Sequence, residues 1–377
     1  MDSFLNIRPV GAIPFRNVFD MEVQPQPVMP DGPIITAVAR NEMLRLPDYL
    51  RHNREIGIRH FLIVDNGSTD GTGEYLDAQP DVTRFLSARN FMTFWPIYRP
   101  WLADTYGVGR WVLAPDIDEH FVYPGWPDLK LRNLLMHWQG CGYEAVFAPM
   151  VDMYADRPLR AIDHDSNDRL ARAYPYFDGE GYWVAPPKAK SMSASPTPPA
   201  ILFGGARDRL DCKAWPNPRN WLGSALIRGF LNHRDPEHPQ PGSRLIHRCF
   251  FTRRIKRGPR SKVPLIRWRK GITFRRSNHR INADLKLAPD WAALLHFRLM
   301  VDHVDKQSTR DKRNRRASAD RMERHQALEK ANLMWEGSRR LSDWRDLAAA
   351  GLIRVSDALL SDLKLDEPFS EIANASR

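Results

Sequence analysis

Cysteine is scarce in this sequence. Three cysteines occur among 377 residues (Cys141, Cys212 and Cys249), and no two of them form a C-x-x-C pair. An odd and scattered set argues against a disulfide framework and against a cysteine-based zinc site, and it fits a reducing compartment. The length allows one large hydrophobic core or two fused ones, so we expect a protein stabilised by its core.

Long apolar runs are also missing. No stretch of the sequence approaches the ~20 apolar residues that a membrane-spanning helix needs. The N-terminal sequence MDSFLNIRPVGAIPF contains an early acid and two prolines, which makes it a poor match to a signal peptide. Both observations predict a cytoplasmic protein. The basic, tryptophan-bearing C-terminal region leaves two interpretations open, a contact with the inner face of a membrane and an ordinary solvated surface.

Acidic residues are in the minority. The 45 Asp and Glu residues are outnumbered by 56 Lys and Arg residues, which gives a formal net charge of +11. Such an excess favours phosphate-bearing small molecules, nucleic acid or an anionic membrane as partners. No acid interrupts the stretch Arg253–Arg280, where Trp268 and Phe274 lie between basic residues. This mixture is typical of a nucleic-acid surface, but an arginine-lined diphosphate pocket or a solvated basic face explains it equally well.

Strand-like apolar runs alternate with helical patterns through the first half of the chain. The expected strands comprise residues 33–39, 60–64, 82–87, 111–114 and 143–150, with helices expected at 46–56, 73–79, 95–106 and 128–138. This order predicts an α/β fold with a mostly parallel sheet covered on both faces. Four regions are expected, namely an irregular lead-in (1–32), the alternating region (33–150), a region with a mobile loop at about 186–200 (151–300) and a helical extension (301–377).

Three polar clusters follow the expected strands, at Arg40–Glu42, Asp65–Asp70 and Asp116–His120. In a mostly parallel sheet the carboxyl ends of the strands meet at one edge, and ligands bind there. We therefore expect the three clusters to form one site.

The segment GRWVLAPDIDEHFVYP carries the strongest chemical signal. Asp116 and Asp118 follow an apolar strand and, by alternation along an extended chain, point to the same side. Their spacing suits a shared hard cation, which could bridge to a diphosphate and neutralise the charge on a leaving group. The alternative is a strand that meets solvent and carries ordinary surface carboxylates.

The other polar residues at strand ends each allow two interpretations. Asp65 could accept hydrogen bonds from a nucleobase or a ribose, or it could form an Asx-turn with the local backbone. Asp70 is better explained as a helix cap than as a ligand. Arg40 and Arg89 could pair with a phosphate or a base carbonyl, or they could be solvated surface arginines.

Two histidines are candidates for chemistry. His296 lies in the apolar run ALLHFR, where a lone histidine is usually a satisfied core residue. His279 lies in SNHRI among polar residues, so we expect it to be exposed and able to carry a proton or contact a substrate.

The stretch IITAVARNEMLRLPDYLRHNREIGIRHFLIVDNGSTDGTGEYL, followed by GRWVLAPDIDEHFVYP, resembles the family 2-type glycosyltransferases, in the branch close to family 92. The resemblance is strong over residues 33–125, and FGGARDRL, KVPLIRWRKG, SNHRI and ALLHFR continue it more sparsely. The motifs VARNE, VDNGSTDGT and DIDE, in this order and spacing, carry the specificity. Asn66 departs from the pattern, which usually has a second Asp at this position.

The resemblance implies a GT-A fold, a nucleotide-sugar donor such as a UDP-sugar, and Mn²⁺ or Mg²⁺. By position, Asp116 and Asp118 would be the D-x-D pair that holds the metal, and His296 would be a late metal ligand. Asp65 and Asp116, the loop Arg40, Asn41 and Glu42, and Arg89 would contact the nucleotide. On the same grounds, residues 33–150 would bind the nucleotide-sugar and residues 151–300 would bind the acceptor.

The implied reaction transfers a sugar to a hydroxyl of a glycan or a lipid-linked saccharide in one inverting displacement, as in polysaccharide biosynthesis. Arginines of the 253–280 stretch would help to stabilise the departing diphosphate. The usual acidic base motif is not obvious in the sequence, and Asp208 and His279 are the candidates for the general base.

Two other classes of protein compete with this interpretation. A nucleotidyltransferase would use a similar carboxylate pair and metal, but it normally has a Gly-rich, Lys-containing loop after its first strand, which VARNE is not. A protein that binds nucleic acid or an anionic surface would use the stretch 253–280 and would not need Asp116 or Asp118. If the chain is a glycosyltransferase, we expect no nucleic-acid partner.

Overall fold

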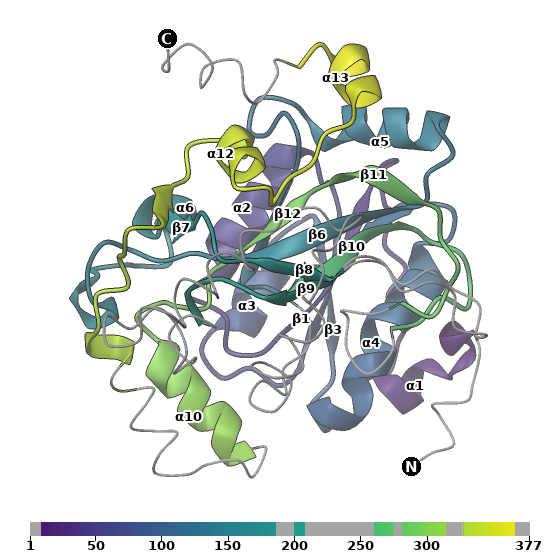
Figure 1. Ribbon diagram of the computed structural model, residues 1–377. Helices are drawn as coiled ribbons and strands as arrows, with labels where there is room; N and C mark the ends of the chain where they lie inside the picture. Colours follow the sequence, from purple (N-terminus) through teal and green to yellow (C-terminus); the bar gives the residue numbers. More distant parts are fainter. Residues whose placement is uncertain are drawn as a thin grey trace.

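The computed structural model describes residues 9–185, 200–207, 260–274, 281–313, 326 and 328–365 (Figure 1). Asp208 and His279, the two candidates for the general base, lie outside these residues, as does the expected mobile loop up to residue 199.

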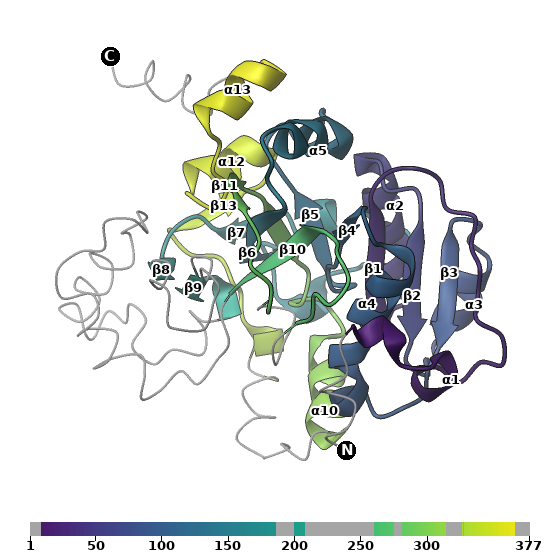
Figure 2. The ribbon, with the colours of Figure 1, turned by 90° about the vertical axis from the view of Figure 1, so that its right-hand side faces the viewer.

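A mixed sheet of nine strands lies at the centre of the described part (Figures 1 and 2). Its strand order is β3-β2-β1-β4-β10-β6-β12-β5, and β11 also pairs with β6. The strands are β1 (Ile34–Ala39), β2 (Phe61–Asp65), β3 (Val82–Leu86), β4 (Trp111–Leu113), β5 (Glu119–Val122), β6 (Ala145–Asp152), β10 (Ser261–Arg267), β11 (Leu287–Trp291) and β12 (Ala293–His296). Five of the strand pairs are parallel and three are antiparallel. The predicted α/β class with a mostly parallel sheet is confirmed.

Helices cover both faces of the sheet because alternate strand residues point to opposite sides. Ile35 of β1 packs in one core with residues of α2 and α5, whereas Ile34 packs in another core with residues of α1 and α4. The helices are η1 (Val10–Ala12), α1 (Phe15–Val18), α2 (Leu46–Ile56), α3 (Thr72–Asp77), α4 (Phe91–Tyr106), α5 (Leu131–Gly140), η2 (Leu159–Ala161), α6 (Leu170–Ala173), α10 (His303–Arg313), α12 (Trp344–Ala349) and α13 (Asp357–Leu363).

Local signals set the ends of the first long helices. α2 has Pro47 in its first turn and is capped by Gly57, as the sequence predicts. The backbone φ of Gly57 is 106°, which glycine adopts without strain. α4 begins at Phe91, four residues before the expected start, because the side chain of Asn90 accepts a hydrogen bond from the backbone N–H of Thr93.

The D-x-D segment lies between two strands that are far apart in the sheet. β4 pairs with β1 and β10 in the middle of the sheet, whereas β5, which the sequence did not reveal, pairs with β12 at its edge. A turn joins them, in which Glu119 N–H donates to the carbonyl of Asp116 (3.0 Å) and Asp116 N–H donates to Glu119 Oε2 (2.8 Å). The chain therefore leaves the sheet centre at this motif.

The stretch that the sequence predicts as a basic surface or pocket contains a central strand. β10 lies between β4 and β6, antiparallel to both, and the side chains of Trp268 and Phe274 are buried. These two aromatic rings are therefore not available to stack on bases. Because β10, β11 and β12 join the same sheet as β1, the sheet also runs across the expected division at residue 150.

After residue 301 the described residues include the helices α10, α12 and α13, the strand β13 and irregular segments between them. β13 (Ser338–Arg340) pairs with β7 (Tyr176–Asp178), and another small sheet joins β8 (Trp183–Ala185) to β9 (Ala200–Phe203). α13 lies against α5 at the opposite end of the molecule from α10 (Figure 1). Among the described helices, none combines the length and the apolar character that crossing a membrane requires.

Candidate functional site

The antiparallel pairing of β5 with β12 brings the D-x-D turn to a histidine. His296 lies opposite Glu119 in this pair, and the N–H of Phe297 donates to the carbonyl of Asp118 (2.7 Å). His296 Nε2 is 3.3 Å from Asp118 Oδ2, and the Asp118 side chain is 25% exposed. Burial opposes ionisation of Asp118, but His296, Arg45 and Arg298 together outweigh it and hold the pKa of Asp118 well below its usual range. The carboxylate is therefore charged and accessible.

The other ring nitrogen of His296 faces a second carboxylate. Asp152 ends β6 and lies beside His296 in the parallel β6–β12 pair. Its Oδ1 is 2.9 Å from His296 Nδ1 and 2.7 Å from Arg207 Nε. Asp152 is only 1% exposed; burial opposes its ionisation, but the charges of Arg207 and His296 hold its pKa well below the usual range. Asp152 fixes the orientation of His296, which leaves Nε2 directed at Asp118.

A buried ammonium group lies next to the same turn. Lys262 Nζ is 2.6 Å from Asp116 Oδ2 and 2.7 Å from Glu119 Oε1, and Lys262 is 1% exposed. Burial disfavours the charged lysine, but Asp116 and Glu119 outweigh it and raise its pKa. Arg99 Nη2 donates to the other oxygen of Asp116 (2.6 Å), so Asp116 lies between two cations.

Three side chains in the described residues could together hold a metal ion. The ligand atoms of Asp118, Glu119 and His296 lie within 4.8 Å of one another. Two carboxylates and an imidazole suit Mn²⁺ better than Mg²⁺, which prefers oxygen ligands alone. Both oxygens of Asp116 face cations, so the expected role of Asp116 as a metal ligand stays a prediction.

The first two polar clusters are joined by hydrogen bonds. The backbone N–H of Asn41 donates to Ser68 Oγ (3.1 Å), and Asn41 Oδ1 accepts from the N–H of Thr69 (2.8 Å). Asn41 adopts a left-handed backbone conformation (φ 52°), which asparagine tolerates better than most residues. Glu42 N–H donates to Thr72 Oγ1 (3.0 Å).

Glu42 connects these loops to the D-x-D turn. Burial raises the pKa of Glu42, and the charge of Asp118 adds to this rise while Lys306 and Arg45 oppose it. Glu42 forms ion pairs with Lys306 and, at 3.6 Å, with Arg45. Arg45 in turn makes a bidentate ion pair with Asp302 (2.6 Å for each bond). The structure thus brings the three clusters to one region, as the sequence predicts.

Most of the other expected nucleotide-binding residues have local partners. Asp65 is 3% exposed; its Oδ1 accepts from the N–H of Ser68 (2.9 Å), which is the Asx-turn of the alternative interpretation, and its Oδ2 pairs with Arg84 (3.2 Å). Asp70 accepts from Thr72 N–H in an Asx-turn and from Met43 N–H (both 3.1 Å). The N-cap of α3 is Gly71, without a side-chain cap, so the prediction that Asp70 is the cap is wrong.

The two candidate arginines differ in their surroundings. Arg40 is exposed and donates to the carbonyl of Asn66 (2.8 Å), which places its guanidinium beside the loop that follows β2. Arg89 donates to the carbonyl of Arg16 (2.8 Å) and pairs with Asp20 (3.3 Å), so it holds the N-terminal segment. The role of Arg89 as a phosphate ligand stays a prediction, and it would require Arg89 to leave its contacts with Arg16 and Asp20.

Sequence reasoning missed two residues of this region. Asp152 follows the expected strand 143–150 as an acid at a strand end, so the rule used for the other clusters could have found it. Lys262 could not have been found in this way, because its place depends on β10 pairing between β4 and β6.

The sequence matches no protein-family model and no curated protein. Among solved structures, the chain is similar to a UDP-glucose pyrophosphorylase from Acinetobacter baumanii, with 11% sequence identity and a TM-score of 0.24. The match covers 33% of this chain and 57% of that chain, so the chain spans little more than half of that enzyme. No conclusion about activity rests on a similarity at this level.

Proposed function

We propose that this protein is a metal-dependent glycosyltransferase of the GT-A type, which transfers a sugar from a nucleotide-sugar, with UDP as the first candidate nucleotide, to a hydroxyl acceptor. The observation that carries the proposal is the meeting of Asp118, Glu119 and His296 at the turn after β4. Their donor set suits a divalent cation, and the turn joins the loops after β1 and β2, where a nucleotide binds in folds of this kind. The order of VARNE, VDNGSTDGT and DIDE supports the same proposal.

In this proposal Asp118 and His296 are the principal metal ligands. Glu119 is a weaker ligand because its carboxylate is already paired with Lys262. A bound Mn²⁺ would supply positive charge against the diphosphate of the donor. Asp152 would hold the His296 ring, and Lys262 with Arg99 would keep Asp116 ionised and in place.

The nucleotide would lie over the joined loops after β1 and β2. Asp65 uses two hydrogen-bond acceptor positions for Ser68 and Arg84, and a carboxylate offers about four. It can therefore keep its turn and still accept from a uracil or ribose group. Arg40 is exposed at the same loop and would contact a phosphate or a base carbonyl.

The test is nucleotide binding with and without the metal. Because a ligand that binds only the folded state raises the thermal midpoint, we expect Mn²⁺ with UDP to raise it more than either alone. Asp118→Ala should abolish the added shift, whereas the exposed Asp128→Ala should keep it. The absence of a metal-dependent shift with any nucleoside diphosphate would overturn the proposal.

Product analysis separates this proposal from a nucleotidyltransferase. A glycosyltransferase incubated with Mn²⁺, a UDP-sugar and an acceptor releases UDP. A nucleotidyltransferase would instead consume UTP and a sugar 1-phosphate and release pyrophosphate. Release of pyrophosphate without UDP would favour the second class.

A further inference from the structure

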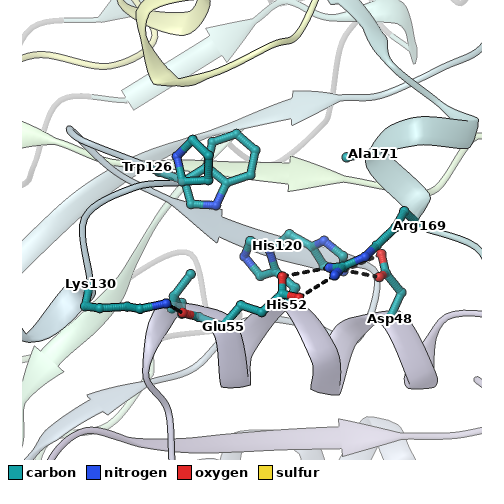
Figure 3. A pocket seen from close by; sticks show the side chains of 10 residues that line it. Asp48, His52, Glu55, His120, Trp126, Lys130, Arg169 and Ala171 are labelled. Carbon is teal, nitrogen blue, oxygen red and sulfur yellow. Dashed lines mark hydrogen bonds and ion pairs between the residues drawn. The ribbon is translucent and has the colours of Figure 1, made fainter.

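A polar cavity, separate from the carboxylate cluster, lies between α2 and β5 (Figure 3). Its volume is about 250 Å³, and none of its lining residues belongs to the group Asp118, Glu119 and His296. His52 rises from α2 and His120 comes from β5, while Trp126 lies on the side away from α2 (Figure 3). Glu119 and His120 are adjacent in the sequence, but Glu119 belongs to the carboxylate cluster whereas His120 lines the cavity.

Two stacked histidines lie at the centre of the cavity wall. Their ring centroids are 4.4 Å apart and their planes differ by 13°. His52 Nε2 is 2.9 Å from the carbonyl of Phe121. Burial lowers the pKa of His52, which disfavours a charged imidazole in this stack.

His120 has an unsatisfied polar atom at this cavity. The residue is 1% exposed, and its Nε2 has no hydrogen-bond partner among the residues that the structure describes. Asp48 Oδ2 lies 4.0 Å away, which is too far for a direct hydrogen bond. A buried nitrogen without a partner is costly, so a hydroxyl that accepts from His120 Nε2–H and donates to Asp48 would stabilise the site.

The charged residues that line the cavity are two acids, Asp48 and Glu55, and two bases, Lys130 and Arg169. Glu55 pairs with Arg169 (2.7 Å to Nη1) and Asp48 pairs with Arg51 (2.6 Å). Lys130 Nζ donates to the carbonyl of Glu55 (2.7 Å). An anionic ligand would lie near Asp48 and Glu55 and a cationic one near Lys130 and Arg169, so the cavity favours an uncharged ligand.

We propose that this cavity binds one ring of an uncharged saccharide. Sugar hydroxyls donate and accept, so one hydroxyl can bridge His120 Nε2 and Asp48 while others reach Arg169. The half-buried indole of Trp126 offers a flat apolar wall. The volume lies just below the roughly 300–1,000 Å³ of typical ligand pockets, which suits a single ring.

The first test is a calorimetric titration of the full-length protein in the absence of nucleotide and metal. The titrants are glucose, galactose and N-acetylglucosamine. We expect millimolar binding of at least one of them, and binding at least about tenfold weaker for the charged analogues glucuronate and glucosamine. If none of the three neutral sugars binds, the cavity holds water only and the proposal fails. Tighter binding of a charged analogue would also overturn it.

Two variants locate the site. Ala171→Leu adds bulk to an alanine that lines the cavity and should abolish binding, whereas Ala173→Leu changes a partly buried alanine of the same helix that does not line it and should keep binding. His120→Phe keeps the ring and removes the nitrogens, so affinity should fall at least about tenfold, the effect of one lost hydrogen bond. Sugar binding that survives in folded Ala171→Leu protein would place the ligand elsewhere.

The test of sugar binding in the cavity does not depend on the proposed transferase activity. Ala171→Leu should keep the Mn²⁺-dependent thermal shift with UDP, because Ala171 lies outside the carboxylate cluster. Loss of sugar binding together with an intact UDP shift would support both sites. A UDP shift without any sugar binding in the wild type would reject this cavity alone.

Discussion

The loops after β2 and β4 both place acids at the carboxyl end of a strand, but they differ in where the partners come from. Asp65 and Asp70 each accept a hydrogen bond from a backbone N–H two or three residues away, at Ser68 and Thr72, and their other partners, Arg84 and Met43, lie 19 and 27 residues away. The partners of Asp118 and Glu119 come from His296 and Lys262, more than 140 residues further along the chain.

This difference teaches that an acid at a strand end is not by itself a ligand. A turn that satisfies its own carboxylate gains local stability and needs no ion. A carboxylate that meets a histidine and another carboxylate from distant strands forms a group that suits a cation. The comparison predicts that long-range partners matter more, for stability and for binding, than local ones.

The largest effect is expected for Lys262→Met. This variant leaves the fully buried Glu119 without its ammonium partner, and breaking such a pair costs about 3–5 kcal/mol. The free energy of unfolding, measured by urea denaturation, should fall by this amount, whereas the exposed Lys270→Met should change it little. A loss below about 1 kcal/mol would mean that Glu119 is not dependent on Lys262.

A loss of metal binding is expected for Asp118→Asn. The variant keeps the size of the side chain and removes its charge, so the affinity for Mn²⁺ in the presence of UDP should fall by more than about 100-fold, because even outer partners are worth about 10–100-fold. Calorimetric titration measures this, with Asp128→Asn as the exposed control. Near-normal affinity of Asp118→Asn for Mn²⁺ would show that the turn after β4 does not bind the metal.

An intermediate effect is expected for Asp152→Asn, which weakens the support of His296. The affinity for Mn²⁺ should fall about 10–100-fold. Asp178→Asn is the matched control, because Asp178 is a buried carboxylate that bonds to Tyr154 and Trp335 instead. If both variants lose stability and neither loses metal affinity, Asp152 is structural only.

The smallest effect is expected for Asp70→Ala in the local loop. Loss of its hydrogen bonds to Met43 and Thr72 should lower the free energy of unfolding by about 1 kcal/mol, as is typical of lost intramolecular hydrogen bonds. The affinity for Mn²⁺ with UDP should stay within about threefold, since Asp70 only shapes the loop. A larger fall in affinity would show that the loop after β2 contributes to metal and nucleotide binding as the turn after β4 does.

The sequence predicted what depends on near neighbours. The ends of α2 follow from Pro47 and Gly57, and the Asx-turn at Asp65 was one of the two interpretations that its Gly-Ser turn allowed. The convergence of the three polar clusters follows from strand order, because parallel strands end at one edge. β5 was missed because it is four residues long and directly follows polar residues.

The sequence by itself determined the α/β class and the strand-end positions of the acids, whereas His296 was a candidate only through the family resemblance. Only the tertiary structure decided which acid meets which partner. Lys262 reaches Asp116 because β10 inserts antiparallel between β4 and β6, and His120 faces α2 because β5 lies at the sheet edge. The physical reason is that hydrophobic periodicity fixes which face of a strand is buried, whereas the order of strands depends on contacts between residues far apart in the chain.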